Sequence, residues 1–126
     1  MKKFALLMIA FSTFLLAEKA DVIDAKIKKS YGGSYIAYVK IKHNDVDASH
    51  FADEWEILDE NRKRITVRLI FGPQPGKEII ESELYGFKIP DGTKKIIIRA
   101  HCSKEGFGGK EFEIELPERN DQNETK

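Results

Sequence analysis

Apolar and charged side chains alternate along much of this chain, and this alternation limits what the chain can fold into. In residues 111–116, Phe112, Ile114 and Leu116 alternate with three glutamates. Successive side chains of a strand point to opposite faces, so such alternation predicts strands with one buried face. No segment of useful length carries the 3.6-residue period of an amphipathic helix. The sequence therefore predicts an all-β domain.

Turn signals such as Gly32-Gly33 and Pro90-Asp91-Gly92 separate the alternating runs. About seven strands are predicted, near residues 21–29, 35–41, 54–57, 65–71, 78–85, 95–99 and 111–116. Seven short, one-sided strands favour an immunoglobulin-like or fibronectin-type antiparallel β-sandwich, with a small open barrel as the alternative. Trp55 is a candidate core residue, and its indole N–H needs a hydrogen-bond partner.

The first seventeen residues have the pattern of a secretory signal peptide. Lys2 and Lys3 precede an apolar run from Phe4 to Leu16, and Ala17 offers a small residue for cleavage. The run is shorter than the roughly twenty residues that usually span a bilayer. We therefore expect a periplasmic protein with a signal peptide at 1–17, a β-sandwich domain at 18–117 and no membrane span after cleavage.

Residues 118–126 contain no aliphatic or aromatic side chain, which predicts a disordered polar tail. Within it, Asn123-Glu124-Thr125 satisfies the N-x-S/T rule for glycosylation. Asp121 supplies the upstream acid, so the stretch DQNET resembles the acceptor of a bacterial periplasmic glycosylation system. Asn123 is therefore a candidate glycosylation site.

Charge and cysteine content restrict the possible partners. The 21 basic and 21 acidic residues are interspersed, so no basic patch predicts binding to nucleic acid. Cys102 is the single cysteine, and an intramolecular disulfide is therefore impossible. Burial as a small apolar residue, ligation of a metal, and an intermolecular disulfide are the three roles open to it.

The stretch HNDVDASHFADEW, residues 43–55, concentrates the side chains that carry chemistry. Its simplest interpretation is a tied connection between two strands, because aspartate, asparagine and serine side chains bind backbone N–H groups in turns. In that interpretation, Asp53 caps a short turn and Phe51 and Ala52 point toward the core.

Two metal sites are alternatives. His43 and His50 could bind copper or zinc together with His101 or Cys102 from the loop after the sixth strand. Since His101 and Cys102 are adjacent, at most one of them can face a given site. Calcium could instead bind oxygen atoms in the same loop. The candidate oxygen ligands, spaced as in a helix–loop–helix calcium site but with histidine at the glycine position, are Asp45, Asp47, Ser49, Asp53 and Glu56.

Catalysis finds little support in the sequence. Ser49 and His50 are neighbours, but sequence neighbours rarely reach nucleophile–base geometry. The glycines of residues 106–109 could cradle an anion, but no helix is predicted to follow them. The sequence therefore predicts a protein that is not an enzyme and needs no cofactor.

The chain resembles a family of small secreted bacterial β-sandwich proteins of uncharacterised function. The resemblance rests on a His-aromatic-Ala-Asp-x-Trp segment at residues 50–55, Gly-x-x-Ile-Pro-x-Gly at 86–92, Arg99-Ala100, and Gly-aromatic-Gly-Gly-Lys at 106–110. Family members often carry a His-Pro-His loop at residues 72–74, an acid at Cys102 and a histidine at Glu105. The resemblance therefore implies the fold more than a shared activity.

These observations favour a non-enzymatic periplasmic binding module that uses the loops at one end of the sandwich. Its partner would be a periplasmic protein or a small ligand. The candidate contact residues are His43, Asp45, His50, Asp53 and Phe107. The alternative is a periplasmic metal-binding protein with copper or zinc on His43, His50, His101 or Cys102, or calcium on Asp45, Asp47 and Asp53.

Overall fold

A computed structural model describes residues 18–117, and within this range the chain is built from seven strands and one short 3-10 helix. The expected signal peptide and the tail with Asn123 lie outside the described residues. The elements are β1 (Asp21–Lys29), η1 (Tyr31–Gly33), β2 (Tyr35–Lys42), β3 (Ala52–Asp59), β4 (Arg64–Leu69), β5 (Ile79–Phe87), β6 (Lys95–Cys102) and β7 (Phe112–Glu115).

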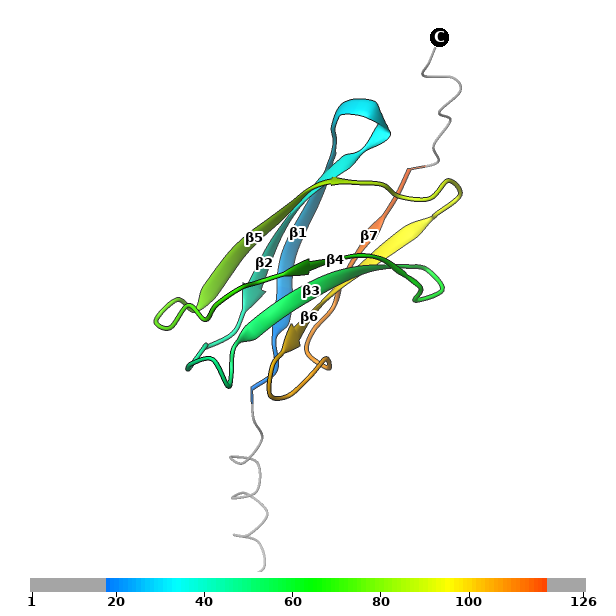
Figure 1. Cartoon of the computed structure of the whole chain (residues 1–126). Coiled ribbons are helices and arrows are strands. Elements are labelled where there is room, and N and C mark those ends of the chain that lie inside the picture. The colour runs from blue at the N-terminus through cyan, green and yellow to red at the C-terminus, as the bar shows by residue number, and fades with distance from the viewer. Residues whose placement is uncertain (1–17, 118–126) are drawn as a thin grey trace, which may run out of the picture.

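The strands form two antiparallel sheets, with the order β1-β2-β5 in one and β4-β3-β6-β7 in the other (Figure 1). The predicted β-sandwich is therefore confirmed, and the open-barrel alternative is wrong. The fourth strand pairs with the third, whereas in immunoglobulin constant domains it joins the sheet of the first, second and fifth strands. The division into three and four strands is the fibronectin-type arrangement.

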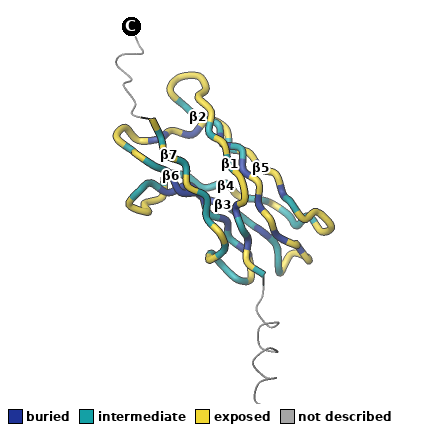
Figure 2. The backbone as a smooth tube through the Cα atoms, turned by 180° about the vertical axis from the view of Figure 1, so that it is seen from behind, coloured by how far each residue is buried: buried dark blue, intermediate teal, exposed yellow. Residues whose placement is uncertain are grey.

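The core lies between the sheets and is made of apolar side chains from both of them, mostly isoleucine, valine and alanine. Figure 2 marks the buried stretches of the backbone in dark blue. Trp55 is fully buried at the centre of the core. Its Nε1–H donates to Oγ of Ser82 on the facing sheet at 2.9 Å, so the partner that the indole needs is present. This hydrogen bond joins the two layers through an otherwise apolar interior.

Strand β4 departs from the predicted pattern. Thr66 and Arg68 pair with Ile57 and Trp55 and so share the inward face of β3, whereas Val67 lies opposite Glu56 on the outward face. The cause is a register shift next to Ile57, because a slip of one residue exchanges the two faces of a strand. Strict alternation along residues 65–71 would place Ile65 and Val67 on the same inward face, and the structure contradicts this, because Ile65 packs against the core and Val67 does not. The strand also ends at Leu69, which leaves Phe71 85% exposed.

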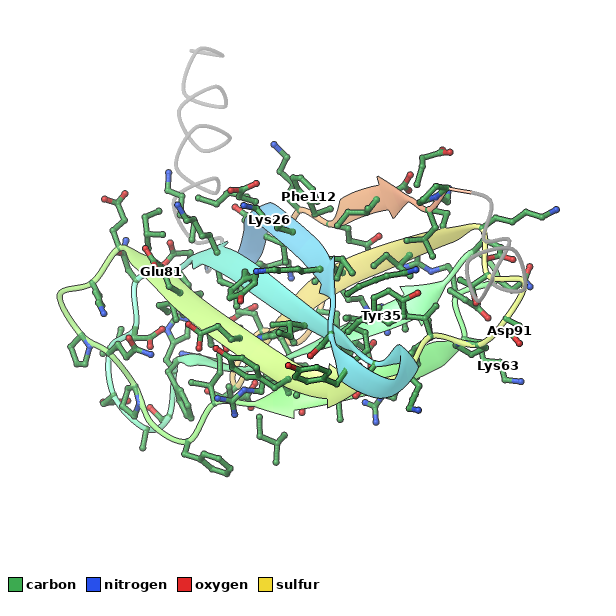
Figure 3. The ribbon with its side chains drawn as sticks, turned by 90° about the horizontal axis from the view of Figure 1, so that it is seen from above. Lys26, Tyr35, Lys63, Glu81, Asp91 and Phe112 are labelled. Carbon is green, nitrogen blue, oxygen red and sulfur yellow. The ribbon has the colours of Figure 1, made fainter. Side chains whose placement is uncertain are left out.

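The sandwich has two ends with different loops. Figure 3 shows Lys63 and Asp91 at one end, where the backbone N–H of Lys94 donates to Glu60. The opposite end gathers the loops of residues 43–51, 70–78 and 103–111, close to the point where residue 18 enters the fold (Figure 1). Most of the candidate contact residues belong to this second end.

Gly109 marks a close approach between the segment before β7 and the segment before β1. A Cβ atom at this position would lie 2.0 Å from the carbonyl oxygen of Ala20. The neighbouring Lys110 pairs with β1, because its N–H donates to Asp21 and its carbonyl accepts from Val22. Close contact with the first strand thus explains one glycine of the Gly-aromatic-Gly-Gly-Lys motif.

We expect Gly109→Ala to lower the free energy of unfolding by about 1–3 kcal/mol, because the added methyl group forces backbone to shift. Chemical denaturation measures this loss. Gly72→Ala is the matched control, since a Cβ at Gly72 would meet no atom within 4 Å. Equal stabilities of the two variants would contradict this account of the contact.

Candidate metal centre

Two histidines and the cysteine converge at the end of the sandwich that carries the loop of residues 43–51. His43 follows the last residue of β2, Cys102 is the last residue of β6, and His50 lies on the loop between β2 and β3. One ligand atom from each residue lies within 4.8 Å of the other two. Both sheets and their connecting loop therefore contribute a donor, which sequence spacing alone could not reveal.

Asp45 orients the ring of His43. Both side chains are fully buried, and Nδ1 of His43 lies 2.7 Å from Oδ1 of Asp45. A carboxylate only accepts hydrogen bonds, so the ring proton sits on Nδ1 and Nε2 keeps its lone pair. Nε2 is buried and has no hydrogen-bond partner within residues 18–117. The imidazole is therefore held in the tautomer that binds a metal through Nε2.

Asp45 is itself fixed by the backbone of two other segments. It accepts from the N–H of Ala52 at 3.0 Å and from the N–H of Gln74 at 2.8 Å, besides the ring of His43. All three partners are donors, so this carboxylate connects the loop of residues 43–51 to β3 and to the loop of residues 70–78.

We expect Asp45→Asn to weaken metal binding about 10- to 100-fold, the usual effect of losing a carboxylate behind a histidine ligand. An amide would direct its NH₂ group at one of three N–H donors whichever way it is turned. Competition titration with a chelator measures the affinity. Asp24→Asn is the control, because Asp24 is exposed on β1 and lies in register with Lys40, away from the cluster. Equal affinities would contradict the role of Asp45.

His50 and Cys102 complete the cluster. Nε2 of His50 is also buried without a hydrogen-bond partner, and its ring meets that of His43 edge to face with centroids 5.1 Å apart. The Cys102 side chain is fully buried, and its Sγ accepts a weak hydrogen bond from the N–H of Glu105 at 3.4 Å. Two ring nitrogens without a hydrogen-bond partner and one buried thiol are thus enclosed together.

The loop of residues 43–51 also has the hydrogen bonds expected of a tied connection. Asp47 accepts from both the N–H and the Oγ of Ser49, and His50 pairs through its backbone with Val46 and Asp47. These hydrogen bonds lower the pKa of Asp47, the side-chain bond from Ser49 being the largest cause. Phe51 and Ser103 then join the loop to the end of β6. The same contacts hold His50 against Cys102, so the structural and the metal interpretations are compatible.

His101 lies apart from this cluster. It is the residue before Cys102 on β6, and its Nδ1 lies 2.6 Å from Oδ1 of Asp53 on β3. His101 and Cys102 thus belong to a strand and not to the loop after it, and Asp53 is a strand residue and not a turn cap. The strand places the two adjacent side chains on opposite faces. Of the four metal ligands predicted, three meet and His101 does not.

Phe107 packs over residues of the same outer face. Its ring lies 3.9 Å from the guanidinium carbon of Arg99, and its centroid is 4.7 Å from that of His101. The five contact residues predicted from sequence are therefore divided between two places. His43, Asp45 and His50 are inside the end of the sandwich, whereas Asp53 and Phe107 are on the outside of β3 and β6.

Glu56 is a buried carboxylate at a strand position where alternation with the core residues Trp55 and Ile57 would predict exposure. It lies on the outer face of the four-stranded sheet, with Nε of Arg64 at 2.8 Å and Nε of Arg99 at 2.6 Å. Burial raises the pKa of Glu56, but hydrogen bonds and charge attraction from the two arginines outweigh this, and the pKa lies below its ordinary value.

Because the pKa of Glu56 is depressed in the folded state, its ion pairs stabilise the protein above about pH 4.3, the ordinary pKa of glutamate. This stabilisation is lost as the pH falls through the lower, folded-state pKa. We therefore expect the unfolding free energy of Glu56→Gln to fall less steeply in acid than that of the wild type. Glu113→Gln, which removes an exposed ion pair with Lys95, should follow the wild-type curve.

The carboxylates of the predicted calcium site do not converge. Asp45 is occupied by three N–H donors, Asp47 by Ser49 and Asp53 by His101. Glu56 is occupied by arginines. Within the described chain, His43, His50 and Cys102 form the only group of three or more metal-binding side chains with this proximity. The geometry therefore favours nitrogen and sulfur donors over oxygen donors.

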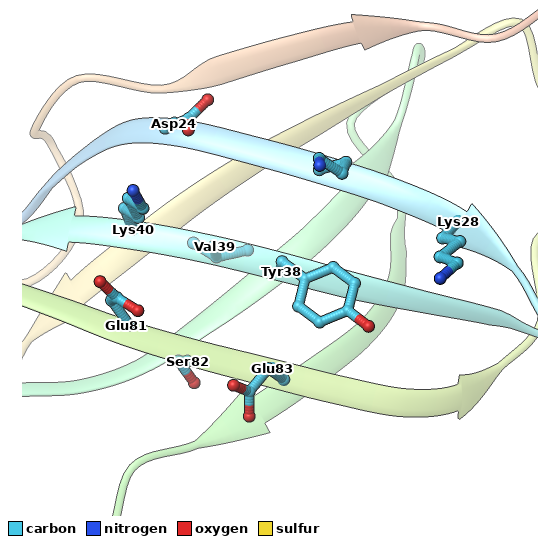
Figure 4. Close-up of a pocket in the computed structure, with 9 residues that line it drawn as sticks. Asp24, Lys28, Tyr38, Val39, Lys40, Glu81, Ser82 and Glu83 are labelled. Atoms are coloured by element: carbon cyan, nitrogen blue, oxygen red, sulfur yellow. The ribbon is translucent and has the colours of Figure 1, made fainter.

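A separate groove of about 390 Å³ crosses the outer face of the three-stranded sheet (Figure 4). Its charged side chains alternate in sign across the strands, with Lys40 between Asp24 and Glu81 and with Lys26 in register with Tyr38 and Glu83. Opposite charges directly across a sheet support strand pairing. The groove has the composition of a solvated sheet face, and the metal-ligating cluster is elsewhere.

Sequence reasoning did not find the groups that position the donors. The backbone N–H of Gln74 donates to Asp45, and the backbone N–H of Glu105 donates to Sγ of Cys102. The hydroxyl oxygen of Ser103 accepts from the N–H of Phe51, in the segment before β3. A backbone donor carries no side-chain signature. The residue types of Gln74 and Glu105 therefore gave no sign of these backbone contacts, although the family resemblance had singled out both positions. All three metal donors were visible by residue type.

Comparison with known proteins gives a distant relative. A protein of Halomicrobium mukohataei named "Putative lipoprotein" is 23% identical over 97 residues, which cover 77% of this chain and 47% of the relative. The chain thus spans about half the length of that protein. No family model and no solved structure matches the chain. Between residues 18 and 117, no helix has the length and apolar character needed to cross a bilayer.

Proposed function

We propose that this protein binds a transition-metal ion through His43, His50 and Cys102. The observation that carries the proposal is the pair of buried Nε2 atoms without a hydrogen-bond partner, on two histidines that each place a ring nitrogen within 4.8 Å of the buried sulfur of Cys102. Each unpaired buried polar atom costs a protein about 1–3 kcal/mol. A metal ion removes this cost for both rings at once.

The chemistry of the donors defines the class of ion. Imidazole nitrogen suits copper, zinc and iron, and thiolate sulfur selects soft ions such as copper(I) and zinc. Only the thiolate binds, so metal uptake releases the thiol proton to solvent. The pairing of His43 with Asp45 is the carboxylate–histidine arrangement found behind metal-ligating histidines.

The cell envelope is the proposed location. The N-terminal pattern of Lys2, Lys3 and a short apolar run is that of an exported protein. The relative from Halomicrobium mukohataei carries the name "Putative lipoprotein", which is compatible with this location. Together with the resemblance to small secreted β-sandwich proteins, these features support a periplasmic location.

Metal analysis of untagged protein expressed from the full-length chain tests the proposal, followed by titration of the ion-free protein with copper, zinc, iron(II) and calcium. We expect one transition metal per chain and a loss of at least tenfold in affinity in His50→Gln. His101→Gln is the matched control, because this neighbour of Cys102 faces Asp53. Binding no tighter than millimolar for every ion would overturn the proposal.

Binding of a partner protein at the same end is a second candidate function, in line with the end-loop module predicted from sequence. It is favoured by two exposed apolar side chains on the loops beside the cluster, Val46 (59% exposed) and Phe71 (85% exposed). Pull-down from envelope extract with Phe71→Ser tests it. Tyr31→Ser is the control, since Tyr31 is 93% exposed and belongs to η1, between β1 and β2. This segment lies away from the cluster, at the opposite end of the sandwich (Figure 1). Identical partners for wild type and Phe71→Ser would overturn it.

A further inference from the structure

We infer that the ion held by His43, His50 and Cys102 is copper, bound by three protein donors as a copper–thiolate centre. This inference rests on the proposed function and specifies which metal the site selects. It follows from the number of donors, from the pairing of the polar groups around them, and from the type of the donor atoms.

The number of donors is three. Within residues 18–117, the group of metal-binding side chains that contains His43, His50 and Cys102 has no fourth member. Asp45, the nearest carboxylate along the chain, accepts three N–H groups and faces the far side of the His43 ring. Zinc sites that are closed to solvent almost always have four protein ligands in a tetrahedron. Three donors leave such a site incomplete.

A water molecule completes the tetrahedron in zinc sites with three protein ligands. Such a water needs acceptors for its two hydrogens. In the described chain, the buried side-chain nitrogen and oxygen atoms without a partner are Nε2 of His43 and Nε2 of His50, and both would be occupied by the metal. The cluster thus offers no unpaired side-chain acceptor for a water ligand, which favours an ion that is stable with three ligands.

The donor types favour copper as well. Two imidazoles and one cysteine in a trigonal arrangement form the strong ligand set of copper–thiolate centres. Copper(II) exceeds zinc in affinity for a given set of nitrogen and sulfur ligands. The non-haem iron(II) oxygenases instead combine two histidines with a carboxylate and keep open positions. The sulfur donor and the burial of His43 and Cys102 distinguish this cluster from that type.

The turn after Cys102 also places a hydrogen-bond donor at its sulfur atom. The N–H of Glu105 points at Sγ of Cys102 at 3.4 Å, and the turn of residues 102–106 is closed by two backbone hydrogen bonds between Cys102 and Gly106. Hydrogen bonds at the cysteine sulfur tune the properties of copper centres.

The ion-free geometry is close to what copper requires. Bonds of about 2.0–2.3 Å to nitrogen and sulfur set the donors of a three-coordinate ion about 3.5–4 Å apart. The donors already lie within 4.8 Å of one another. A contraction of about 1 Å therefore brings them into range, and the loop that carries His50 can supply it because that residue is only partly buried.

Competition between the two metals tests the inference. The ion-free protein is mixed with equal concentrations of copper and zinc, each in excess, and the bound ions are quantified after gel filtration. We expect copper to exceed zinc by at least tenfold. X-ray absorption of the copper protein should show two nitrogen ligands and one sulfur ligand. The copper(II) form should show the intense visible absorption of a copper–thiolate bond.

Variants connect these signals to the donors. Cys102→Ser should abolish the visible absorption, and His50→Gln should lower copper affinity with the thiol still present. His101→Gln should leave both unchanged. Circular dichroism of each variant establishes that the sandwich is folded. If Cys102→Ser does not fold, His50→Gln and the sulfur signal of the wild type decide the question.

The outcomes separate the two proposals. Preferential binding of zinc, or of iron(II), at the same three residues would overturn the assignment to copper and leave the metal-binding function in place. Copper bound without a sulfur ligand would also overturn it. Failure to bind any of these ions would overturn both proposals.

Discussion

Saturation with the proposed metal ion is expected to stabilise this protein by about 4 kcal/mol when the free ion is present at about 1,000 times its dissociation constant. The proposed site exists only in the folded state, because its donors come from the end of β2, the following loop and the end of β6. For a domain of this size the melting temperature should rise by about 15 °C or more. Differential scanning calorimetry with and without the ion measures the shift.

Removal of the sulfur donor should eliminate this stabilisation. Cys102→Ala replaces a buried side chain by a smaller apolar one, so the ion-free variant should remain folded with a modest loss of stability. Its melting temperature should not respond to the ion. His101→Gln should respond as the wild type does. An equal metal-dependent shift in Cys102→Ala would show that the ion stabilises the fold from another position.

Trp55→Ala is expected to destabilise the protein by about 3–5 kcal/mol, the usual cost of deleting a large aromatic side chain from a core. Trp55 is fully buried between the sheets, and its removal leaves the hydroxyl oxygen of Ser82 without the N–H group that donates a hydrogen bond to it. Single domains have about 5–15 kcal/mol of stability in total. Urea denaturation followed by circular dichroism measures the loss, since Trp55 is the only tryptophan and the variant lacks its fluorescence.

Two controls divide this effect into its parts. Trp55→Phe keeps an aromatic ring but removes the hydrogen bond to Ser82, so it should cost less than Trp55→Ala. Tyr31→Ala removes an aromatic side chain that is 93% exposed and should change stability by less than about 0.5 kcal/mol. A loss in Trp55→Ala no larger than that in Tyr31→Ala would contradict the central position of Trp55 in the core.

The fold could be predicted from the sequence because one physical rule, burial of every second side chain, governs most of its strands. β2 and β7 follow that rule closely. It failed at β4, where a register shift beside Ile57 turns Val67 outward and Thr66 inward. It also failed to show that Glu56 is buried, because the two arginines that surround it come from other strands. Neither feature depends on local sequence.

The candidate metal centre was predictable by residue type but not by geometry. His43, His50 and Cys102 are recognisable as donors, and the two-residue period of a strand correctly implied that His101 and Cys102 cannot serve the same site. The sequence could not show that β2 and β6 end side by side on facing sheets. It also could not show that the N–H of Gln74 holds Asp45, since that contact joins residues 29 positions apart.

The complete enclosure of Cys102 has a consequence for storage and handling of the protein. A single thiol at the surface would link two molecules in air, but this sulfur is covered and can react only when the end of the sandwich transiently opens. The rate at which covalent dimers accumulate, followed on a non-reducing gel, therefore reports how often this end of the sandwich opens. An ion bound by donors from both layers would lower this rate of dimer formation, and samples treated with a chelator would form covalent dimers fastest.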